Sequence, residues 1–267
     1  MTHNHQEYPD QHMNVTDYDA ITRSFDEENH SVIHFEHIET KEKKNIPQFQ
    51  SKLRSRIVEV PEEIYEASGI LIFGKRIKSL LFSTDIAIIR NSNAQSVIAV
   101  YPFTPQGSIM KAIIDTASVP VFAGVGGGTT TGTRSVFLAF QAEQMGAYGV
   151  VVNAPMENEV IRQIRDSIDI PLIATVSSFK DDFVGKLEAG ATMLNVSGGA
   201  ETAKLVAHIR SIIGPNIPII ATGGPSGQMI KETIQAGANA ITYTPPTSAE
   251  IFAELMKKYR GADDHED

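Results

Sequence analysis

The sequence predicts an α/β fold, a (β/α)8 TIM barrel preceded by an N-terminal extension, and three observations lead to it. Eight strand-like runs follow one another at regular intervals, helix-like stretches separate them, and glycine–alanine pairs close several of these helices just before a strand. Strands that alternate with helices form parallel sheets. Eight units of this spacing suit a closed barrel better than an open, doubly wound sheet.

The predicted strands are near-continuous runs of Val, Ile, Leu and Ala, as expected of parallel strands that are buried on both faces. In chain order they cover 77–83, 96–104, 119–124, 148–153, 171–176, 192–196, 218–222 and 240–244. Between them, apolar residues recur at helical spacing, for example in 157–165 and 203–212. A hairpin that turns at Gly74-Lys75-Arg76 leads into the first strand. The pairs that end helices are Gly146-Ala147, Gly190-Ala191 and Gly237-Ala238.

The chain divides into an extension over residues 1–60, a barrel over 61–260 and an acidic, disordered tail over 261–267. The extension is polar and holds six of the eight histidines, and so short a segment would bury little core of its own. Within it we expect a short helix in 16–29 and a short strand in 31–38.

Composition limits the classes of partner and chemistry. A net charge of −9 and a pI near 5.4 argue against binding of nucleic acids or anionic membranes. The absence of cysteine excludes disulfides, thiolate metal sites and a cysteine nucleophile. No signal peptide and no apolar run long enough to span a bilayer can be recognised, so the expected location is cytoplasmic.

In a barrel the active site lies at the C-terminal ends of the strands, and these positions are poor in charge. Asp85 is the one carboxylate among them, and it can serve as acid or base, as a metal ligand, or as the N-cap of the first helix. Asn153 and Asn195 also end strands. Their amides could polarise a substrate carbonyl as part of the catalytic set, or hold neighbouring loops.

Glycine-rich turns follow three of the strands. The segment Pro218–Ser226 contains Thr222, Gly223 and Gly224, and it resembles the phosphate-binding turn of flavin- and phosphate-binding barrels. Indole-glycerol-phosphate synthase, thiamine-phosphate synthase and sugar-phosphate epimerases belong to that group. The resemblance implies a phosphorylated ligand or the phosphate of FMN, with Thr244 on the neighbouring turn. Alternatively, the two glycines only make a tight turn.

The chain departs from that pattern after the eighth strand, where it reads Thr244-Pro245-Pro246-Thr247. Two prolines remove two N–H donors, and Thr247 with Glu250 predicts a capping box that would occupy the helix end. The other two turns offer further ligand positions. The turn after the third strand contains Gly126, Gly127 and Gly128, followed by Arg134, and it is a lid, a ligand cradle or a plain flexible loop. The turn after the sixth strand contains Ser197, Gly198 and Gly199 and is a third segment of exposed backbone.

Three functions fit these features. The first is an enzyme that acts on a small phosphorylated metabolite as an isomerase, lyase or synthase. The second is a hydrolase in which Asp85 places a water molecule or a metal ion, with His34 and Glu36 as further ligands if the extension folds over the barrel mouth. The third is a non-catalytic barrel that binds a metabolite for regulation. No cofactor is required by the sequence, although FMN or a divalent metal is compatible with it, and self-association into a homo-oligomer is expected.

Overall fold

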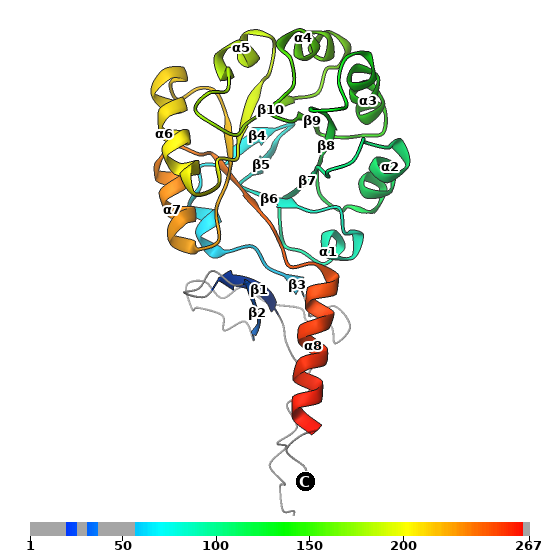
Figure 1. The fold of residues 1–267 in the computed structure, drawn as a ribbon, viewed down its shortest axis with the longest axis vertical. Coiled ribbons are helices and arrows are strands. Elements are labelled where there is room, and N and C mark those ends of the chain that lie inside the picture. The colour runs from blue at the N-terminus through cyan, green and yellow to red at the C-terminus, as the bar shows by residue number, and fades with distance from the viewer. Residues whose placement is uncertain (1–19, 26–30, 37–56, 264–267) are drawn as a thin grey trace, which may run out of the picture.

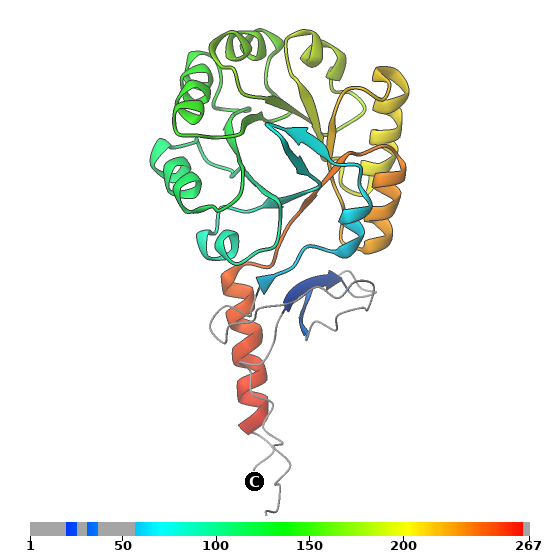
Figure 2. The same cartoon turned by 180° about the vertical axis from the view of Figure 1, so that it is seen from behind.

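The computed structural model describes residues 20–25, 31–36 and 57–263, and its centre is a closed barrel of parallel strands (Figures 1 and 2). The pairing of Thr242 in the last strand with Leu80 in the first closes the ring. The predicted (β/α)8 barrel is therefore confirmed. Its strands are β6 (Ser79–Phe82), β7 (Ser96–Ala99), β8 (Val121–Gly126), β9 (Gly149–Val152), β10 (Leu172–Val176), β11 (Met193–Val196), β12 (Ile219–Thr222) and β13 (Ala240–Tyr243).

Helices on the outside of the barrel connect successive strands, as Figure 1 shows. Their apolar faces pack on the outward side chains of the strands and form the larger of two hydrophobic clusters. These helices are α1 (Ile86–Arg90), α2 (Gly107–Thr116), α3 (Thr133–Gln144), α4 (Asn158–Ser167), α5 (Phe183–Glu188), α6 (Thr202–Ile213) and α7 (Gly227–Gln235), with the short 3-10 helix η2 (Gly199–Glu201) before α6.

The second hydrophobic cluster fills the inside of the barrel. It contains one inward side chain from each barrel strand, Leu80, Ile98, Phe122, Val151, Ile173, Met193, Ile220 and Ala240. The hairpin of β4 (Ile70–Ile72) and β5 (Lys75–Ile77) adds three isoleucines to this cluster and so closes the N-terminal end of the barrel. The predicted hairpin is confirmed, although it turns at Phe73-Gly74, both with positive φ, rather than at Gly74-Lys75-Arg76.

Residues before the barrel add strands β1 (Ala20–Phe25), β2 (Ser31–Glu36) and β3 (Ile57–Val58) and the 3-10 helix η1 (Glu62–Glu66). The strand expected in 31–38 is confirmed, whereas the helix expected in 16–29 is wrong for Ala20–Phe25, which pairs antiparallel with β2. Ile21, Thr22 and Phe25 are β-branched or aromatic residues, which favour a strand. η1 packs along α7.

Helix α8 (Ser248–Asp263) leaves the barrel and runs away from it in both views (Figures 1 and 2). The first three residues of the predicted tail therefore lie in this helix. None of the helices in the described part of the chain is both long and apolar enough to cross a membrane.

Candidate functional site

The inside of the barrel becomes polar toward the C-terminal ends of β9 to β13. Side chains alternate along a strand, so the residue two positions beyond each inner apolar residue faces inward again. In the ladder Thr175 pairs with Asn195, and Thr222 pairs with Thr242. We call this set the polar layer, and it consists of Asn153, Thr175, Asn195, Thr222 and Thr242.

Two atoms of the polar layer are buried without a hydrogen-bond partner among the described residues, Oδ1 of Asn195 and Oγ1 of Thr242. Asn195 is 9% exposed, and its Nδ2 donates only a long hydrogen bond of 3.4 Å to Oγ1 of Thr175. Buried polar atoms are nearly always paired with protein, water or a ligand. These two atoms therefore mark the inner end of the mouth as a place where a water molecule or a ligand atom completes the hydrogen bonding.

A pocket of about 120 Å³ opens beside the polar layer, over the ends of β7, β8 and β9. We call it the rim pocket. Asn153 belongs to both the pocket lining and the polar layer, so the pocket adjoins the layer at the end of β9. The lining residues are Val100, Tyr101, Pro102, Phe103, Pro105, Gly124, Gly126, Gly127, Thr129, Thr130 and Asn153.

The turn after β8 shapes one wall of the rim pocket. Gly126 and Gly127 have φ of 147° and 120°, and the N–H of Gly127 donates to the carbonyl oxygen of Thr130 at 2.8 Å. A Cβ atom on Gly127 would lie 2.5 Å from Cβ of Asn153, so only glycine lets the two segments approach this closely. The turn is thus a closed, ordered wall that holds Asn153 in position.

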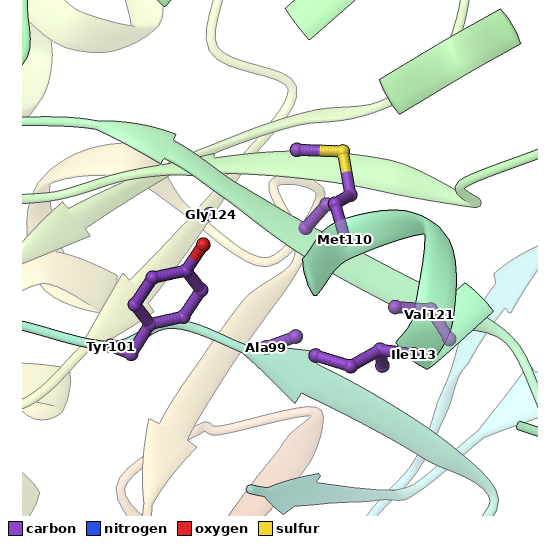
Figure 3. A pocket seen from close by; sticks show the side chains of 7 residues that line it. Ala99, Tyr101, Met110, Ile113, Val121 and Gly124 are labelled. Carbon is purple, nitrogen blue, oxygen red and sulfur yellow. The ribbon is translucent and has the colours of Figure 1, made fainter. Parts of the chain in front are cut away.

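Tyr101 forms another wall, and it also borders a small apolar cavity beneath the rim pocket. Figure 3 shows the tyrosine ring on one side of this cavity and Met110 on the other. The Tyr101 hydroxyl accepts a hydrogen bond of 2.9 Å from the backbone N–H of Gln106. Its proton is therefore still available for donation, which makes Tyr101 the ionisable side chain of the rim pocket lining.

A buried lysine fastens the loop that follows Asn153. Lys186 is 3% exposed, and its Nζ donates to the carbonyl oxygens of Ala154 at 2.7 Å and Met156 at 3.2 Å. Burial lowers the pKa of the Lys186 ammonium, and the carboxylates of Asp181 and Asp182 partly oppose that effect. Lys186 thus connects α5 to the β9 end of the mouth, and it is a support rather than part of the pocket lining.

Asp85 occupies the capping position that was one of its expected roles. Its Oδ1 accepts from the N–H groups of Ala87 and Ile88, and its Oδ2 accepts from the hydroxyl of Ser248 at 2.6 Å and from the Ser248 N–H at 3.3 Å. The carboxylate therefore joins the start of α1 to the start of α8. Both oxygens are in use, so the structure gives no support to a catalytic or metal-binding role for Asp85.

Asp85 predicts a specific pH dependence of stability. Burial raises the pKa of its carboxyl group, but the hydrogen bonds from Ser248, Ile88 and Ala87 outweigh burial, and the net pKa lies below the ordinary value. A lowered pKa contributes stability above the unfolded pKa of about 4, and this stability is lost as the pH falls through the folded pKa.

We expect Asp85→Ala to reduce the free energy of unfolding by about 1 kcal/mol at pH 7, the usual effect of losing an N-cap, and by progressively less on acidification. Urea unfolding of both proteins at pH 7, 5 and 3 measures this. Asp115→Ala is a matched control, because Asp115 forms only an exposed pair with Lys111. An Asp85→Ala deficit that stays constant down to pH 3 would contradict the assignment.

The turn after β12 is well packed, but the N–H of Gly223 and the nearby start of α7 are already in contact with other groups of the protein. The N–H of Gly223 donates to the carbonyl oxygen of Thr242, and Ser226 caps α7 by accepting from the N–H of Met229. The Glu63 carboxylate lies against Gly227 in the first turn of α7, so negative charge already occupies that helix end. Thr222 contacts Oγ1 of Thr202 at 3.2 Å.

The neighbouring turn after β13 is closed by a capping box, as the sequence predicts. Oε2 of Glu250 accepts from the N–H of Thr247 at 2.7 Å, and Oγ1 of Thr247 accepts from the N–H of Glu250. Thr244 is exposed. The geometry of both turns thus argues against Gly223, Gly224 and Thr244 as a phosphate site, a role that stays a prediction.

The remaining predicted ligand residues lie apart from the rim pocket lining. Gly198 donates its N–H to Oγ1 of the buried Thr202, and Ser197 and Gly199 belong to the same turn. Gly128 is exposed beyond the pocket wall, and Arg134 is exposed at the second residue of α3, without a hydrogen bond or ion pair to any residue that the structure describes. Arg134 is therefore a cation available near the mouth.

Of the predicted site residues, the structure brings Asn153, Gly126 and Gly127 together in the rim pocket and places Asn195 in the polar layer on β11, two strands from β9. The residues that sequence reasoning did not assign a role are Tyr101, Phe103, Thr129, Thr130 and Thr242, although Tyr101 and Phe103 belong to the strand end expected at the rim. Period-two alternation beyond Ala240 would have placed Thr242 inside the barrel. The two threonines lie inside a loop, and no local signal shows that they turn back onto the pocket.

Comparisons with known proteins support the fold. No family model matches the chain, and no curated protein matches it significantly. Among solved structures it is similar to oxaloacetate acetylhydrolase (TM-score 0.56, 12% identity, covering 76% of this chain and 85% of that one). It is also similar to 2,3-dimethylmalate lyase, described as a PEP mutase/isocitrate lyase superfamily member (TM-score 0.53, 12% identity, 76% and 81%). A third is phosphonopyruvate hydrolase in complex with oxalate and Mg++ (TM-score 0.50, 12% identity, 72% and 94%). These barrels are not the flavin- and phosphate-binding enzymes that the β12 turn resembles, so they lend no support to FMN.

The mouth does not fit a magnesium ion held by the protein alone. Magnesium sites use one or two carboxylates together with water or substrate phosphates. The polar groups of the polar layer and the rim pocket are amides, hydroxyls and backbone, and the described ranges contain no group of three His, Asp or Glu side chains that could hold a metal ion. The side chains of His34 and Glu36 lie outside the described residues, so a metal site that includes them stays a prediction.

Proposed function

We propose that the protein is an enzyme that binds a small organic or phosphorylated acid at the C-terminal mouth of its barrel and cleaves or rearranges it. The observation that carries the proposal is that the rim pocket adjoins the polar layer at Asn153, and that Oδ1 of Asn195 and Oγ1 of Thr242 in this layer are buried without a hydrogen-bond partner among the described residues. Pockets with a few convergent polar groups at the C-terminal face of a barrel are the usual active sites of this fold.

The charges and hydrogen-bonding groups of the mouth determine how an acid would be oriented in it. The interior end of the mouth contains no charged side chain among the described residues of the polar layer, and a buried anion without a cation is costly. The acid group therefore belongs on the side of the rim pocket, where Asn153 is only half-buried and Thr129 and Arg134 are exposed. A hydroxyl of the ligand would point inward and donate to Asn195 Oδ1.

Within this arrangement Tyr101 is the proton carrier. Tyr101 lines the rim pocket, and the one described partner of its hydroxyl, the N–H of Gln106, is a donor. The tyrosine can therefore give a proton to a leaving or developing oxyanion of the substrate. Asn153 would hold the reacting group against it by a hydrogen bond from its amide.

The solved structures of similar fold act on small acids according to their titles, which name oxaloacetate, 2,3-dimethylmalate and phosphonopyruvate. At 12% identity this likeness concerns the fold, and it makes small acids the first compounds to test. A lyase or a hydrolase is the class of enzyme that these titles suggest.

A second candidate is a non-catalytic barrel that binds a small acid for regulation. The observation that favours it is the scarcity of proton carriers, since the rim pocket lining has Tyr101 and no Asp, Glu, Lys or His. Binding without any turnover would identify this function.

The deciding experiment is a thermal-shift screen of the full chain with inorganic phosphate, oxalate, pyruvate, malate, oxaloacetate and phosphoenolpyruvate, followed by NMR detection of products. A compound at 100 times its Kd adds about 2.7 kcal/mol, which raises Tm by several degrees. We expect Asn153→Leu to lose this shift, whereas Asn216→Leu, an exposed change in the loop before β12, should retain it. An unchanged shift in Asn153→Leu would rule out the rim pocket as the site.

A further inference from the structure

Phe103 is a strongly exposed aromatic side chain in the lining of the rim pocket. It is 75% exposed, yet it contributes to the pocket wall together with Pro102, Pro105 and Val100. This wall is apolar, whereas the opposite wall presents the Asn153 amide, two threonine hydroxyls and the backbone of the Gly126–Gly127 turn. The pocket is thus divided into an apolar side and a polar side.

The loop that carries Phe103 is held at several points. Pro102 and Pro105 fix their own φ angles on either side of the ring. The Tyr101 hydroxyl accepts from the N–H of Gln106, and Oγ1 of Thr130 donates to Oγ1 of Thr104 at 3.2 Å. A backbone that is fixed before binding loses little conformational entropy when a ligand contacts it. The loop therefore holds Phe103 at the edge of the pocket before a ligand binds.

Aromatic rings bind planar π systems more strongly than the buried area alone explains, by stacking or by edge-to-face contact. With a volume of about 120 Å³, the pocket accepts an acid group and the atoms next to it. A planar portion attached to that acid group would then reach the Phe103 ring at the pocket edge.

We propose that the rim pocket selects small acids that carry a planar, unsaturated or aromatic portion, and that Phe103 is the residue that determines this selectivity. The acid group is held on the polar side by Asn153, and the planar portion lies against Phe103 and Pro102. The inference rests on the proposed function, because it assigns a substrate class to the same pocket.

The test compares benzoate with cyclohexanecarboxylate, which share a carboxylate and a six-membered ring but differ in planarity. Binding to the full chain is measured by NMR titration for the native protein, for Phe103→Leu and for Phe137→Leu. Phe137 is a suitable control because it is also exposed, at 59%, but lies on α3 away from the pocket lining. Leucine keeps an apolar side chain and removes the ring.

We expect the native protein and Phe137→Leu to prefer benzoate by about 2- to 10-fold, the range that a stacking contact supplies, and Phe103→Leu to bind both acids equally. The same preference in Phe103→Leu would overturn the inference. So would the failure of both ring acids to bind while oxalate or malate binds, and that outcome would leave the proposed function standing. Failure of every acid to bind would instead overturn the proposed function.

Discussion

Gly127→Ala is expected to lower the free energy of unfolding by about 3 kcal/mol, through backbone strain and overpacking together. A Cβ atom at this position would lie 2.5 Å from Cβ and 2.9 Å from the backbone nitrogen of Asn153. Neither of these atoms can move without shifting β9, because the Asn153 N–H donates to the carbonyl oxygen of Gly126 at 2.9 Å. The φ of 120° adds strain for any residue with a side chain. In a chain of this size the loss corresponds to a Tm lowered by about 6 to 12 °C.

Gly128→Ala is the matched control, because Gly128 also has a positive φ, of 70°, but a Cβ there would meet no atom within 4 Å. We expect Gly128→Ala to lower the free energy of unfolding by about 1 kcal/mol, the usual effect of a side chain on a residue in the left-handed conformation. Thermal and urea unfolding of both variants separate the two effects, because Gly128→Ala introduces only backbone strain, whereas Gly127→Ala adds a steric clash with Asn153. Equal losses in the two variants would show that the close approach of Gly127 to Asn153 does not determine the shape of the pocket.

Tyr101→Phe is expected to reduce turnover of the substrate found in the acid screen by about 10²- to 10⁴-fold, the contribution of a positioned general acid. The ring remains and continues to fill the wall between the rim pocket and the apolar cavity, so Kd should change by less than about threefold. The N–H of Gln106 loses its acceptor, but Gln106 is exposed and water replaces the hydroxyl.

The control for this variant is Tyr148→Phe. Tyr148 packs against Phe73 and Lys75 of the hairpin at the N-terminal end of the barrel, far from the mouth, and its change should leave kcat unaltered. Steady-state kinetics across pH separate a lost proton donor, which lowers kcat, from a lost contact, which raises KM. Full turnover in Tyr101→Phe would remove the tyrosine from the mechanism.

The barrel could be predicted from the sequence because its strands are apolar and regularly spaced. The capping box of Thr247 and Glu250 could also be predicted, since it depends on residues three positions apart. The helix expected over Ala20–Phe25 is wrong because the segment is short and its pairing with β2 decides its conformation. A strand whose stability depends on a partner strand cannot be predicted reliably from its own residues alone.

The site was predictable only in part. Strand ends identified Asn153 and Asn195, because alternation and barrel topology place them in the mouth. The role of Asp85 was ambiguous, because an aspartate before a helix can be an N-cap or a catalytic or metal-binding carboxylate. Its contact with Ser248, which favours the structural role, joins residues 163 positions apart and has no local signal in the sequence. The glycines after β8 suggested a lid or ligand cradle, whereas their positive φ values and contact with Asn153 give them a role in packing the pocket wall.

The central claim is that small acids bind at the C-terminal mouth, and the side-chain amides of asparagine report on it directly. In protein labelled with ¹⁵N-asparagine, a titration with the best acid of the screen should shift the amide signals of Asn153 and Asn195, each assigned by its loss in the Leu variant. The amide of Asn239 should not move, because it binds Ser68 and Arg210 at the opposite end of the barrel. Shifts at Asn239 with Asn153 and Asn195 unaffected would contradict the account.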